Sequence, residues 1–524
     1  MDLQKRYNYV WLVFGLFTFL ALFYGCSYHL LHKEEISLFM FTGEFLKAYF
    51  HKPAWITCLL GDFCTQFFCI KGVGAFIIAC IATAISICFY HCIRRCTNSK
   101  IWLYLSLLIG GLEAVRACQL IYPLSSSLSL LFGLVLSLWY GSVRSTWRIV
   151  IGLLIAAIGY ILIGYGVFIF LLFVLFQSWK APDLKMKIFN VLLMIFVGLY
   201  PIISCRFYLL TSKQAYFYPA IVEETFYNMP LYERILKLDA ACVSENWEEL
   251  LEMIPQDVYL NLYSYYYNMA YAAEGKLPEK IWDYYQIGVE GLFIPIDASS
   301  SYLTTLWSGE LWFKLGDMTM AEHAYLLSMI FSPNHNGRRM IQRLAEINLI
   351  NGDTEAARKY LRILSHTLFY KDWAEKRMPE SLDEEVNKWL QRRRKLIPVS
   401  DTIRISTMDV VKSLRVLVKS CPENTFAYDY LLCNHLLSKD IDSFVQDYVP
   451  IPGKSPHRLY AEALLIDLFR KKASAKEIQE LIIDPKIMLD FKEYNRLVKE
   501  NPSLLELRFG KTYWYYYQFV TNKK

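Results

Sequence analysis

Two adjacent carboxylates stand where the first long apolar run of the chain gives way to polar sequence. Glu34 and Glu35 follow the run Tyr7–Leu31 almost directly. Carboxylates at a boundary between lipid and water can have a raised pKa or can hold a divalent metal, and either property would suit activation of an acceptor hydroxyl group. We therefore take Glu34 and Glu35 as candidate catalytic residues. The simpler alternative is an ordinary solvated turn.

A second group of ionisable residues lies within or beside the apolar runs. Glu113 and Arg116 are three residues apart, so on a helix they share a face and can pair. Ionisable groups inside a membrane are costly unless they pair or serve a pathway. Asp62 and Arg206 could converge with them on one cavity, where an arginine would suit a lipid-linked phosphate. We take all four as candidate substrate-binding residues; the alternative is ion pairing that fixes helix packing.

Other kinds of site are poorly represented in the sequence. A phosphate-binding glycine loop, an HExxH helix and a nucleophile elbow do not occur. His91, Cys92 and Cys96 resemble a metal cluster, but a second ligand pair at zinc-like spacing is missing. We expect no cofactor, apart from a divalent metal if the chain is an enzyme. The net charge of +6 comes largely from basic residues between apolar segments, so we expect no nucleic-acid partner.

The candidate residues depend on segments that are apolar enough to cross a bilayer. A lipid core about 30 Å thick needs about 20 apolar residues per helix. Residues 149–178 are long for one helix, and we favour a short hairpin that turns near Gly159, Gly164 and Gly166. We therefore predict about seven spans: Tyr7–Leu31, Gly72–Tyr90, Ile101–Leu120, Pro123–Ser142, the two arms of the hairpin, and Ile188–Leu210.

Basic residues predict the orientation of these spans. Lys5 and Arg6 precede the first span and should keep the N-terminus in the cytoplasm. Cytoplasmic turns are then marked by Arg94 with Arg95, by Arg144 with Arg148, and by Lys180, Lys185 and Lys187. Seven spans would place the rest of the chain outside the cytoplasm, whereas six would place it within the cytoplasm.

The first outer loop, residues 32–71, is long, aromatic and amphipathic. Its apolar residues recur near helical spacing on both sides of Pro53, at Ile36, Phe39, Leu46 and Phe50 and then at Ile56, Leu59, Leu60, Phe63 and Phe67. We predict two interfacial helices. They either brace the bundle or form a platform that shapes a site facing the lipid.

The second half of the chain has a sequence pattern that is typical of a helical solenoid. Glycines at 275, 316 and 352 each follow one helical stretch and precede another, at spacings of 41 and 36 residues. These spacings bracket the roughly 34-residue period of tetratricopeptide repeats. Weaker copies turn at Ser244–Asn246 and near Lys439 and Asp440. We predict a membrane bundle at 1–211, a connector at 212–229 and a tetratricopeptide-like repeat domain at 230–524.

Two segments depart from this rhythm. Residues 371–410 include the basic run Arg392–Lys395, which we interpret as an inserted helix and connector with a solvated charged face. The aromatic cluster Tyr513–Phe519 should pack as a cap over the last repeat, with stacking of a ligand as the alternative.

The chain resembles two groups of proteins. Its outward first span, the acidic pair after it, the amphipathic loop and the trailing repeats resemble the C-type membrane glycosyltransferases, which move sugars from polyprenyl-phosphate donors; this resemblance implies that Glu34 and Glu35 act as base or metal ligand. Typical C-type enzymes have more spans and often an Asp-Glu pair. The stretches GDFCTQFF at 61–68, RLAEINLINGD at 343–353 and KTYWYYYQF at 511–519 resemble an uncharacterised bacterial family of multi-spanning proteins.

The fold class expected from these features is all-α, a polytopic bundle followed by an α-solenoid. Two functions follow. The repeats could present a concave surface to a protein or peptide partner, with the bundle as their anchor in membrane lipid. Alternatively, the bundle could hold a polyprenyl-phosphate-linked donor while the repeats hold an acceptor. A transporter is less favoured, because the spans lack paired discontinuous helices and contain few charges. Whether the chain is an enzyme stays open at this point.

Overall fold

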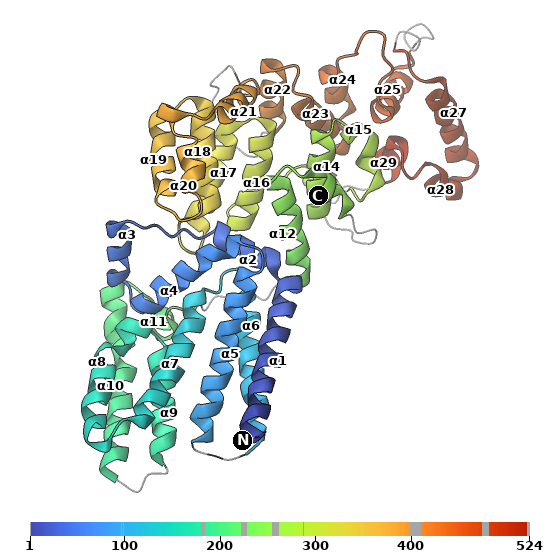
Figure 1. Ribbon diagram of the computed structural model, residues 1–524. Coiled ribbons are helices and arrows are strands. Elements are labelled where there is room, and N and C mark those ends of the chain that lie inside the picture. Colours follow the sequence, from blue (N-terminus) through green and yellow to red (C-terminus); the bar gives the residue numbers. More distant parts are fainter. Residues whose placement is uncertain are drawn as a thin grey trace. The chain divides into compact units, whose positions relative to one another are not determined.

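The computed structural model describes residues 2–95, 97, 99–179, 184–221, 228–253, 261–286, 288–398, 410–473 and 481–520. Every regular element in these ranges is a helix (Figure 1). The chain divides into two compact units. Unit 1 contains residues 1–236, 332–342 and 359–378, and unit 2 contains residues 237–331, 343–358 and 379–524.

Unit 1 is a bundle of long apolar helices. Five helices of the described chain are long and apolar enough to cross a membrane. They are α1 (Asp2–Gly25), α5 (Val73–Arg94), α6 (Ile101–Cys118), α7 (Leu124–Ser142) and α10 (Leu184–Tyr208). Their polar backbone groups are paired within each helix, as a lipid environment requires. The membrane class predicted from the apolar runs is therefore supported for these five helices.

The first helix is shorter than the sequence suggests. We predicted one span over Tyr7–Leu31, but α1 ends at Gly25 and α2 (Ser27–Glu35) begins after Cys26, whose φ is −142°. The prediction of one continuous helix was therefore wrong at its C-terminal end. The physical reason is that residues 27–35 are mostly polar and find buried polar partners, which a helix continuing into lipid could not provide.

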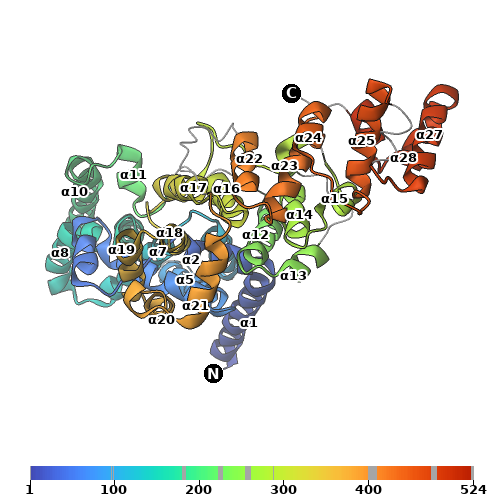
Figure 2. The ribbon, with the colours of Figure 1, turned by 90° about the horizontal axis from the view of Figure 1, so that it is seen from above.

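The segment 149–178 forms two helices, α8 (Ser145–Ile163) and α9 (Gly166–Trp179), which contact each other. The chain reverses at Gly164, whose φ of +66° is readily adopted by glycine. The 14 residues of α9 span about 21 Å, less than a full hydrocarbon core. In both views α8 and α10 lie side by side (Figures 1 and 2).

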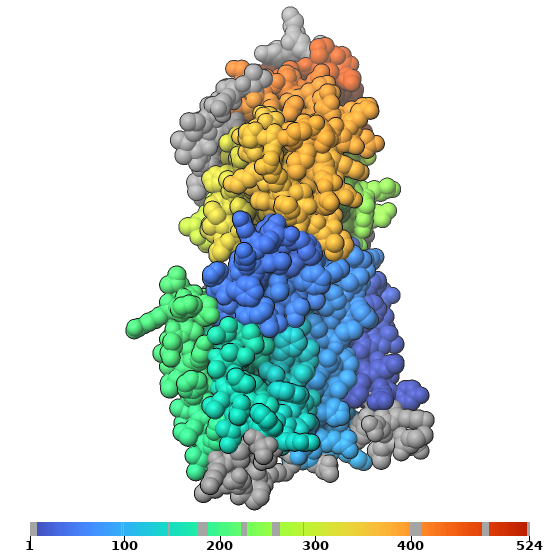
Figure 3. Space-filling model, turned by 60° about the vertical axis from the view of Figure 1, so that its left-hand side comes forward, coloured from blue at the N-terminus to red at the C-terminus, as the bar shows by residue number. Residues whose placement is uncertain are grey.

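The predicted interfacial helices exist only in part. After Pro53, the helix α4 (Trp55–Thr65) and the 3-10 turn η2 (Gln66–Cys69) carry the predicted apolar stripe. Between the end of α2 at Glu35 and Pro53, only α3 (Gly43–Ala48) and η1 (Tyr49–His51) are helical. Ile36 is buried at the C-cap of α2, and Phe39 is buried in the non-helical stretch that follows, whose backbone bonds to residues 338 and 366. Figure 3 shows the blue side chains of this segment packed against the teal side chains of the bundle.

Unit 2 consists of short helices, several of them paired across the turns that the sequence marks. The clearest pair is α16 (Tyr302–Leu315) with α17 (Met318–Phe331), which turn at Gly316 with a φ of +98°. Others are α12 (Met229–Val243) with α13 (Trp247–Glu252), α18 (Arg338–Asn351) with α19 (Thr354–Ser365), and α23 (Thr425–Leu437) with α24 (Ile441–Asp447). The division between the units falls within α12, α18 and α19.

The pair around Gly275 is less regular than a tetratricopeptide repeat. α14 (Asn261–Ala273) is followed by α15 (Leu277–Lys280), which is only four residues long and continues as a 3-10 turn. Pro278 occupies the start of α15, where a proline is tolerated, so it does not explain the early end. The remaining helices of unit 1 are α11 (Ser212–Phe217) and α20 (Lys371–Glu375). Those of unit 2 are α21 (Glu384–Arg394), α22 (Val410–Ser420), α25 (Arg458–Lys471), α27 (Pro485–Glu500), α28 (Leu505–Phe509) and α29 (Tyr513–Phe519).

Some predictions lie partly outside the described residues. These are Cys96 of the supposed metal cluster, Lys180 of the last cytoplasmic turn, the stretch 399–409 of the inserted segment, and the side chains of Lys5, Arg6 and Lys185. The predicted aromatic cap is described: Tyr513, Trp514 and Tyr516 of α29 are buried, and Trp514 belongs to a core formed with α25, α27 and α28.

Candidate functional site

The helix α2 is short, polar and almost entirely buried. Its side chains His29, His32, Lys33, Glu34 and Glu35 are all less than 9% exposed. The carboxylate of Glu233 in α12 accepts hydrogen bonds from the first-turn amides of Tyr28, at 2.8 Å, and His29, at 3.0 Å. It thereby satisfies two of the free N–H groups that begin every helix and complements the positive end of the helix dipole.

The two candidate catalytic residues at the end of α2 are held by two arginines that begin α18. Arg338 Nη2 lies 2.8 Å from Glu34 Oε2, and Arg339 Nη1 lies 3.3 Å from Glu35 Oε2. The ring of Tyr370 lies under the Arg338 guanidinium, at 4.8 Å from its centroid. The Arg338 amide also donates to the carbonyl of Ser37, at 3.0 Å. Two short segments of unit 1 are thus joined by side chains and backbone.

Burial and the arginines oppose each other in setting the pKa values of the two acids. Burial raises the pKa of Glu34, and the Arg338 charge offsets only part of that rise. Burial would also raise the pKa of Glu35, but the charges of Arg339 and Arg338, together with His32, whose Nδ1 lies 3.6 Å from Glu35 Oε2, hold the pKa at about 2. Because both carboxylates are already neutralised by guanidinium groups, they do not fit as ligands of a divalent cation. Their arrangement favours holding residues 332–342 in place.

The candidate pair Glu113 and Arg116 meets at one tyrosine. Glu113 Oε1 accepts hydrogen bonds from the hydroxyls of Tyr122, at 2.8 Å, and Ser127, at 2.6 Å. The Arg116 guanidinium lies over the Tyr122 ring, 4.7 Å from its centroid. Lys33 of α2 donates to the carbonyl of Tyr122, at 2.6 Å. This group therefore connects with α2, and its contacts fix the α6–α7 turn.

A cavity of about 410 Å³ opens beside these groups in unit 1. Its volume lies within the range of small-molecule sites, about 300–1,000 Å³. Four parts of the chain form its walls. They are the segment 37–62, which runs from the end of α2 through α3 to α4, the start of α7, the connection between α10 and α11, and residues 333–336. The lining residues are Ser37, Leu38, Phe45, Ala48, Tyr49, Lys52, Cys58, Asp62, Pro123, Ser125, Leu210, Thr211, Lys213, Gln214, Tyr218, Pro219, Ala220, Ile221, Pro333, Asn334, His335 and Asn336.

Asp62 is the carboxylate in the wall of this cavity. The hydroxyl of Tyr49 donates to its Oδ2 at 2.7 Å. Burial raises the pKa of Asp62, while the bond from Tyr49 and the charge of Lys52 oppose that rise. The Lys52 ammonium lies 5.3 Å from the centre of the Tyr49 ring. A carboxylate fixed by a phenol, with a raised pKa and beside a cation, is suited to accept a proton from a bound hydroxyl group.

The structure therefore does not bring the candidate residues together in one cavity. Asp62 lines the cavity, whereas Glu34 and Glu35 lie behind Ser37 and Leu38, which do line it. Glu113 and Arg116 stand at the α6–α7 turn. Arg206 is exposed on α10 and is not among the residues that line the cavity. The roles predicted for these residues stay predictions.

Sequence reasoning missed several residues that shape this region. They are Tyr49, Lys52, Lys213, His335, Arg338 and Arg339. Arg338 and Arg339 carried one usable signal: an adjacent pair of cations in the chain that matches the adjacent pair of anions at Glu34 and Glu35. The lysines carried none, because exposed lysines are common on amphipathic segments.

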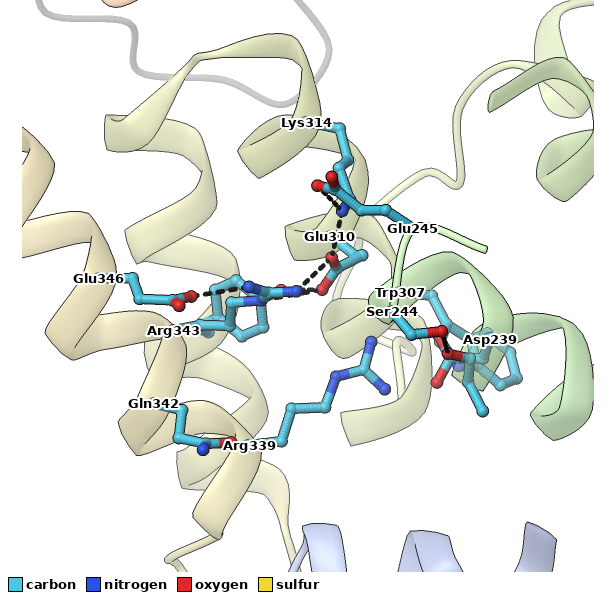
Figure 4. Close-up of polar contacts among 12 residues, drawn as sticks. Asp239, Ser244, Glu245, Trp307, Glu310, Lys314, Arg339, Gln342, Arg343 and Glu346 are labelled. Atoms are coloured by element: carbon cyan, nitrogen blue, oxygen red, sulfur yellow. Dashed lines mark hydrogen bonds and ion pairs between the residues drawn. The ribbon is translucent and has the colours of Figure 1, made fainter. Parts of the chain in front are cut away.

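Unit 2 contains a buried charge network of its own (Figure 4). Glu310 is 1% exposed, and its carboxylate lies 2.7 Å from Arg343 Nη2. The other terminal nitrogen of Arg343, Nη1, pairs with Glu346. Lys314 lies 2.6 Å from Glu245 in the α12–α13 turn. The Arg343 guanidinium covers the Phe313 ring at 4.5 Å. Every charge in this group has a partner of opposite sign, so the network serves to join the helices that carry it.

Within the described residues, no group of three or more histidine, cysteine or acidic side chains could hold a metal ion. The five long apolar helices indicate a helical membrane protein as the class.

The chain belongs to a family of unknown function (DUF6057), whose model matches residues 3–520. No curated protein and no solved structure gives a significant match. These comparisons support the predicted membership of an uncharacterised family, but give no support to the glycosyltransferase resemblance or to a tetratricopeptide domain.

Proposed function

We propose that this protein is an integral membrane protein that binds an amphiphilic ligand in the cavity around Asp62. The observation that carries the proposal is the cavity itself, with its mixed lining. Leu38, Phe45 and Ile221 offer apolar contacts, while Asp62 and Lys52 offer polar ones. Its walls come from the amphipathic segment after α2 and from the end of α10, a candidate span. A ligand with one apolar and one polar part suits such a lining.

The proposed topology has seven crossings, with the N-terminus in the cytoplasm and unit 2 in the periplasm of a bacterial inner membrane. It is supported by short connections between contacting helices, which make neighbours antiparallel. The turn at Gly164 divides this segment into the two helices α8 and α9, which supports counting them as two crossings. Basic residues Arg94, Arg95 and Arg144 then share the cytoplasmic end, as the positive-inside rule requires.

In this proposal, unit 2 is a tetratricopeptide-like solenoid whose surface binds a protein or peptide partner, or an acceptor. The helix pairs at Gly316 and Gly352 support it, since each is a helical hairpin with a glycine in the left-handed conformation at its turn. Stacked hairpins of this kind form extended concave binding surfaces.

A second candidate function is a transferase that resembles the C-type glycosyltransferases, and the geometry of Asp62 favours it. Its carboxylate would take the proton of an acceptor hydroxyl group. The hydroxyl oxygen would form a bond to the anomeric carbon of the sugar, and the bond from that carbon to the polyprenyl phosphate would break, with its electron pair leaving on the phosphate. Tyr49 and Lys52 would position the carboxylate.

Photo-crosslinking tests ligand binding. A benzophenone amino acid replaces Phe45, which lines the cavity, or Phe50, which is exposed nearby and does not line it. After illumination of membranes that contain the full chain, mass spectrometry should find a discrete adduct at position 45 and the bulk lipid mixture at position 50. The same adducts at both positions, or none at 45, would contradict the proposal.

The transferase is tested with Asp62→Asn. Membranes containing the full chain receive a radiolabelled polyprenyl-phosphate hexose, and the loss of label from the donor is measured. The variant should keep the position-45 adduct but lose turnover, whereas Glu44→Gln, an exposed carboxylate on α3, should behave as the native chain. Equal turnover in all three chains, or turnover in none, would count against catalysis by Asp62 while leaving ligand binding intact.

Sidedness is tested separately with a cysteine added after Lys524. In cells whose outer membrane is permeabilised, an impermeant maleimide should label it. Protection until the inner membrane is dissolved would mean an even number of crossings and would overturn the proposed topology.

A further inference from the structure

We propose that the ligand of this cavity carries a phosphate or pyrophosphate head group, which Lys52 and Lys213 bind. The inference rests on the proposed binding of an amphiphile and does not require the transferase. It assigns to the cavity a ligand chemistry and two residues that recognise it.

The charges that line the cavity favour an anion. Within the described chain, Lys52 and Lys213 are the lysines in its wall, and Asp62 is the carboxylate. Asp62 already accepts a hydrogen bond from Tyr49 and has the Lys52 charge close to it. A cationic ligand would therefore meet two ammonium groups and one carboxylate that has a partner, whereas an anion would meet the two ammonium groups directly.

Both lysines are held by local structure. Lys52 follows η1, and its ammonium lies over the ring of Tyr49. Lys213 lies in α11 (Ser212–Phe217), whose start is fixed by a capping box: Thr211 accepts from the Gln214 amide at 3.2 Å, and Gln214 accepts from the Thr211 amide at 3.0 Å. Lys52 thus reaches the cavity from beside Tyr49 and Lys213 from the capped start of α11, and both residues are exposed to solvent.

The neutral polar groups in the lining suit a group with several oxygens. Ser125, Thr211, Tyr218 and Asn334 carry side-chain donors in the same wall. Lysine acts as a point charge that binds phosphate without a fixed bidentate geometry. A phosphate monoester offers three oxygens and close to two negative charges near neutral pH, which matches two lysines better than a carboxylate does.

The apolar part of the lining gives the ligand its second half. Leu38, Phe45, Leu210 and Ile221 line the same cavity, and Leu210 lies two residues after Tyr208, the last residue of the candidate span α10. An alkyl chain attached to the phosphate would bury its methylene groups against these side chains, and this burial favours binding. The shared chemistry is the phosphate, and the chain decides between a lipid and a free phosphate as its source.

Equilibrium binding of radiolabelled dodecyl phosphate to the full chain in detergent tests the inference. Lys52→Gln and Lys213→Gln should each weaken binding at least about tenfold, as loss of a charge-assisted hydrogen bond predicts. Lys52→Arg and Lys213→Arg keep the charge and should retain most of the affinity. Lys47→Gln is the matched control, because Lys47 is exposed on α3 and does not line the cavity; it should bind as the native chain does.

Competition with unlabelled compounds identifies the source. Dodecanol and dodecanoate should compete at least about tenfold more weakly than dodecyl phosphate. If inorganic pyrophosphate competes as well as dodecyl phosphate, the head group is recognised free; if only the alkyl phosphate competes, it is recognised on a lipid. Binding that is unchanged in the Lys52→Gln, Lys213→Gln double variant, or equal competition by dodecanol, would overturn the inference even if the position-45 adduct is found. A discrete adduct at position 45 that is uncharged would also overturn the inference of a phosphate head group, but the proposed binding of an amphiphile would still hold.

Discussion

The guanidinium of Arg338 lies 2.8 Å from the carboxylate of Glu34, although the two residues are 304 positions apart. The same arginine donates its backbone amide to Ser37, three residues after Glu34. Residues 333–336 line the cavity directly before this arginine, and Ser37 and Leu38 line it directly after the glutamates. The ion pairs therefore position two walls of the cavity. Glu34 and Arg338 act on the cavity through the backbone they hold.

Loss of either partner should destabilise the protein more than loss of an exposed pair. Arg338→Ala leaves the buried carboxylate of Glu34 without its ion-pair partner, and we expect about 3–5 kcal/mol of lost stability. Glu34→Ala should cost less, because Glu35 still lies 3.5 Å from the Arg338 guanidinium. The double variant should lose less than the sum of the two. Thermal and denaturant unfolding of the full chain in detergent measures this cycle. The exposed pair of Glu384 with Lys388 is the control, and its cycle should give a coupling energy of about 0–1 kcal/mol. A similar coupling energy for both pairs would contradict the larger contribution of the buried pair to stability.

Glu35 gives a pH dependence of known sign. Its pKa in the folded chain is about 2, below the ordinary value of 4.5, because the arginine charges outweigh burial. The folded state therefore binds fewer protons than the unfolded state, and the stabilisation by Glu35 is present above pH 4.5 and is lost as the pH falls toward 2. The difference in stability between the native chain and Glu35→Gln should be constant from pH 6 to 8 and should shrink below about pH 4.5. A difference that shrinks between pH 6 and 8 would contradict the lowered pKa.

Apolar length and turn residues predict much of this fold. The runs behind α5, α6, α7 and α10 are visible because a bilayer demands a long uninterrupted apolar stretch. The turns at Gly316 and Gly352 are visible because glycine adopts a positive φ without steric cost.

Tertiary partners explain what the sequence does not show. The break at Cys26 depends on Glu233, which caps α2 from 204 to 205 positions away. The non-helical stretch around Phe39 bonds to residue 366 through Phe41 and so overrides the helical spacing of its apolar residues. The place of Asp62 in an amphipathic loop marks it as a candidate, but Lys213, which lines the same cavity, comes from a segment about 150 positions later in the chain. Spacing along the chain carries no information about such contacts.

Close packing of α4 on α7 should be sensitive to one methyl group. A Cβ on Gly61 would lie 2.6 Å from the backbone nitrogen of Ser125, a distance that forces the two helices apart. Gly61→Ala should cost about 1–3 kcal/mol or more, as overpacking does, and it should also lower ligand binding, since Ser125 lines the cavity. Gly43→Ala, where a Cβ would meet nothing within 4 Å, is the control. Equal melting temperatures for the two variants would contradict the packing seen between α4 and α7.

Two glycines at turns of unit 2 allow the cost of backbone strain to be measured separately from the cost of steric crowding. Gly352 has a φ of +86° and open space around it, so Gly352→Ala should cost only the strain of a left-handed alanine, about 1 kcal/mol. Gly316 has a φ of +98°, and a Cβ there would also lie 2.9 Å from the backbone oxygen of Leu396. Gly316→Ala should therefore destabilise the chain more than Gly352→Ala, with the excess measured by denaturant unfolding. Because both variants carry the same backbone penalty, an equal loss would show that the segment with Leu396 yields freely, and the contact between Gly316 and Leu396 would then contribute nothing to stability.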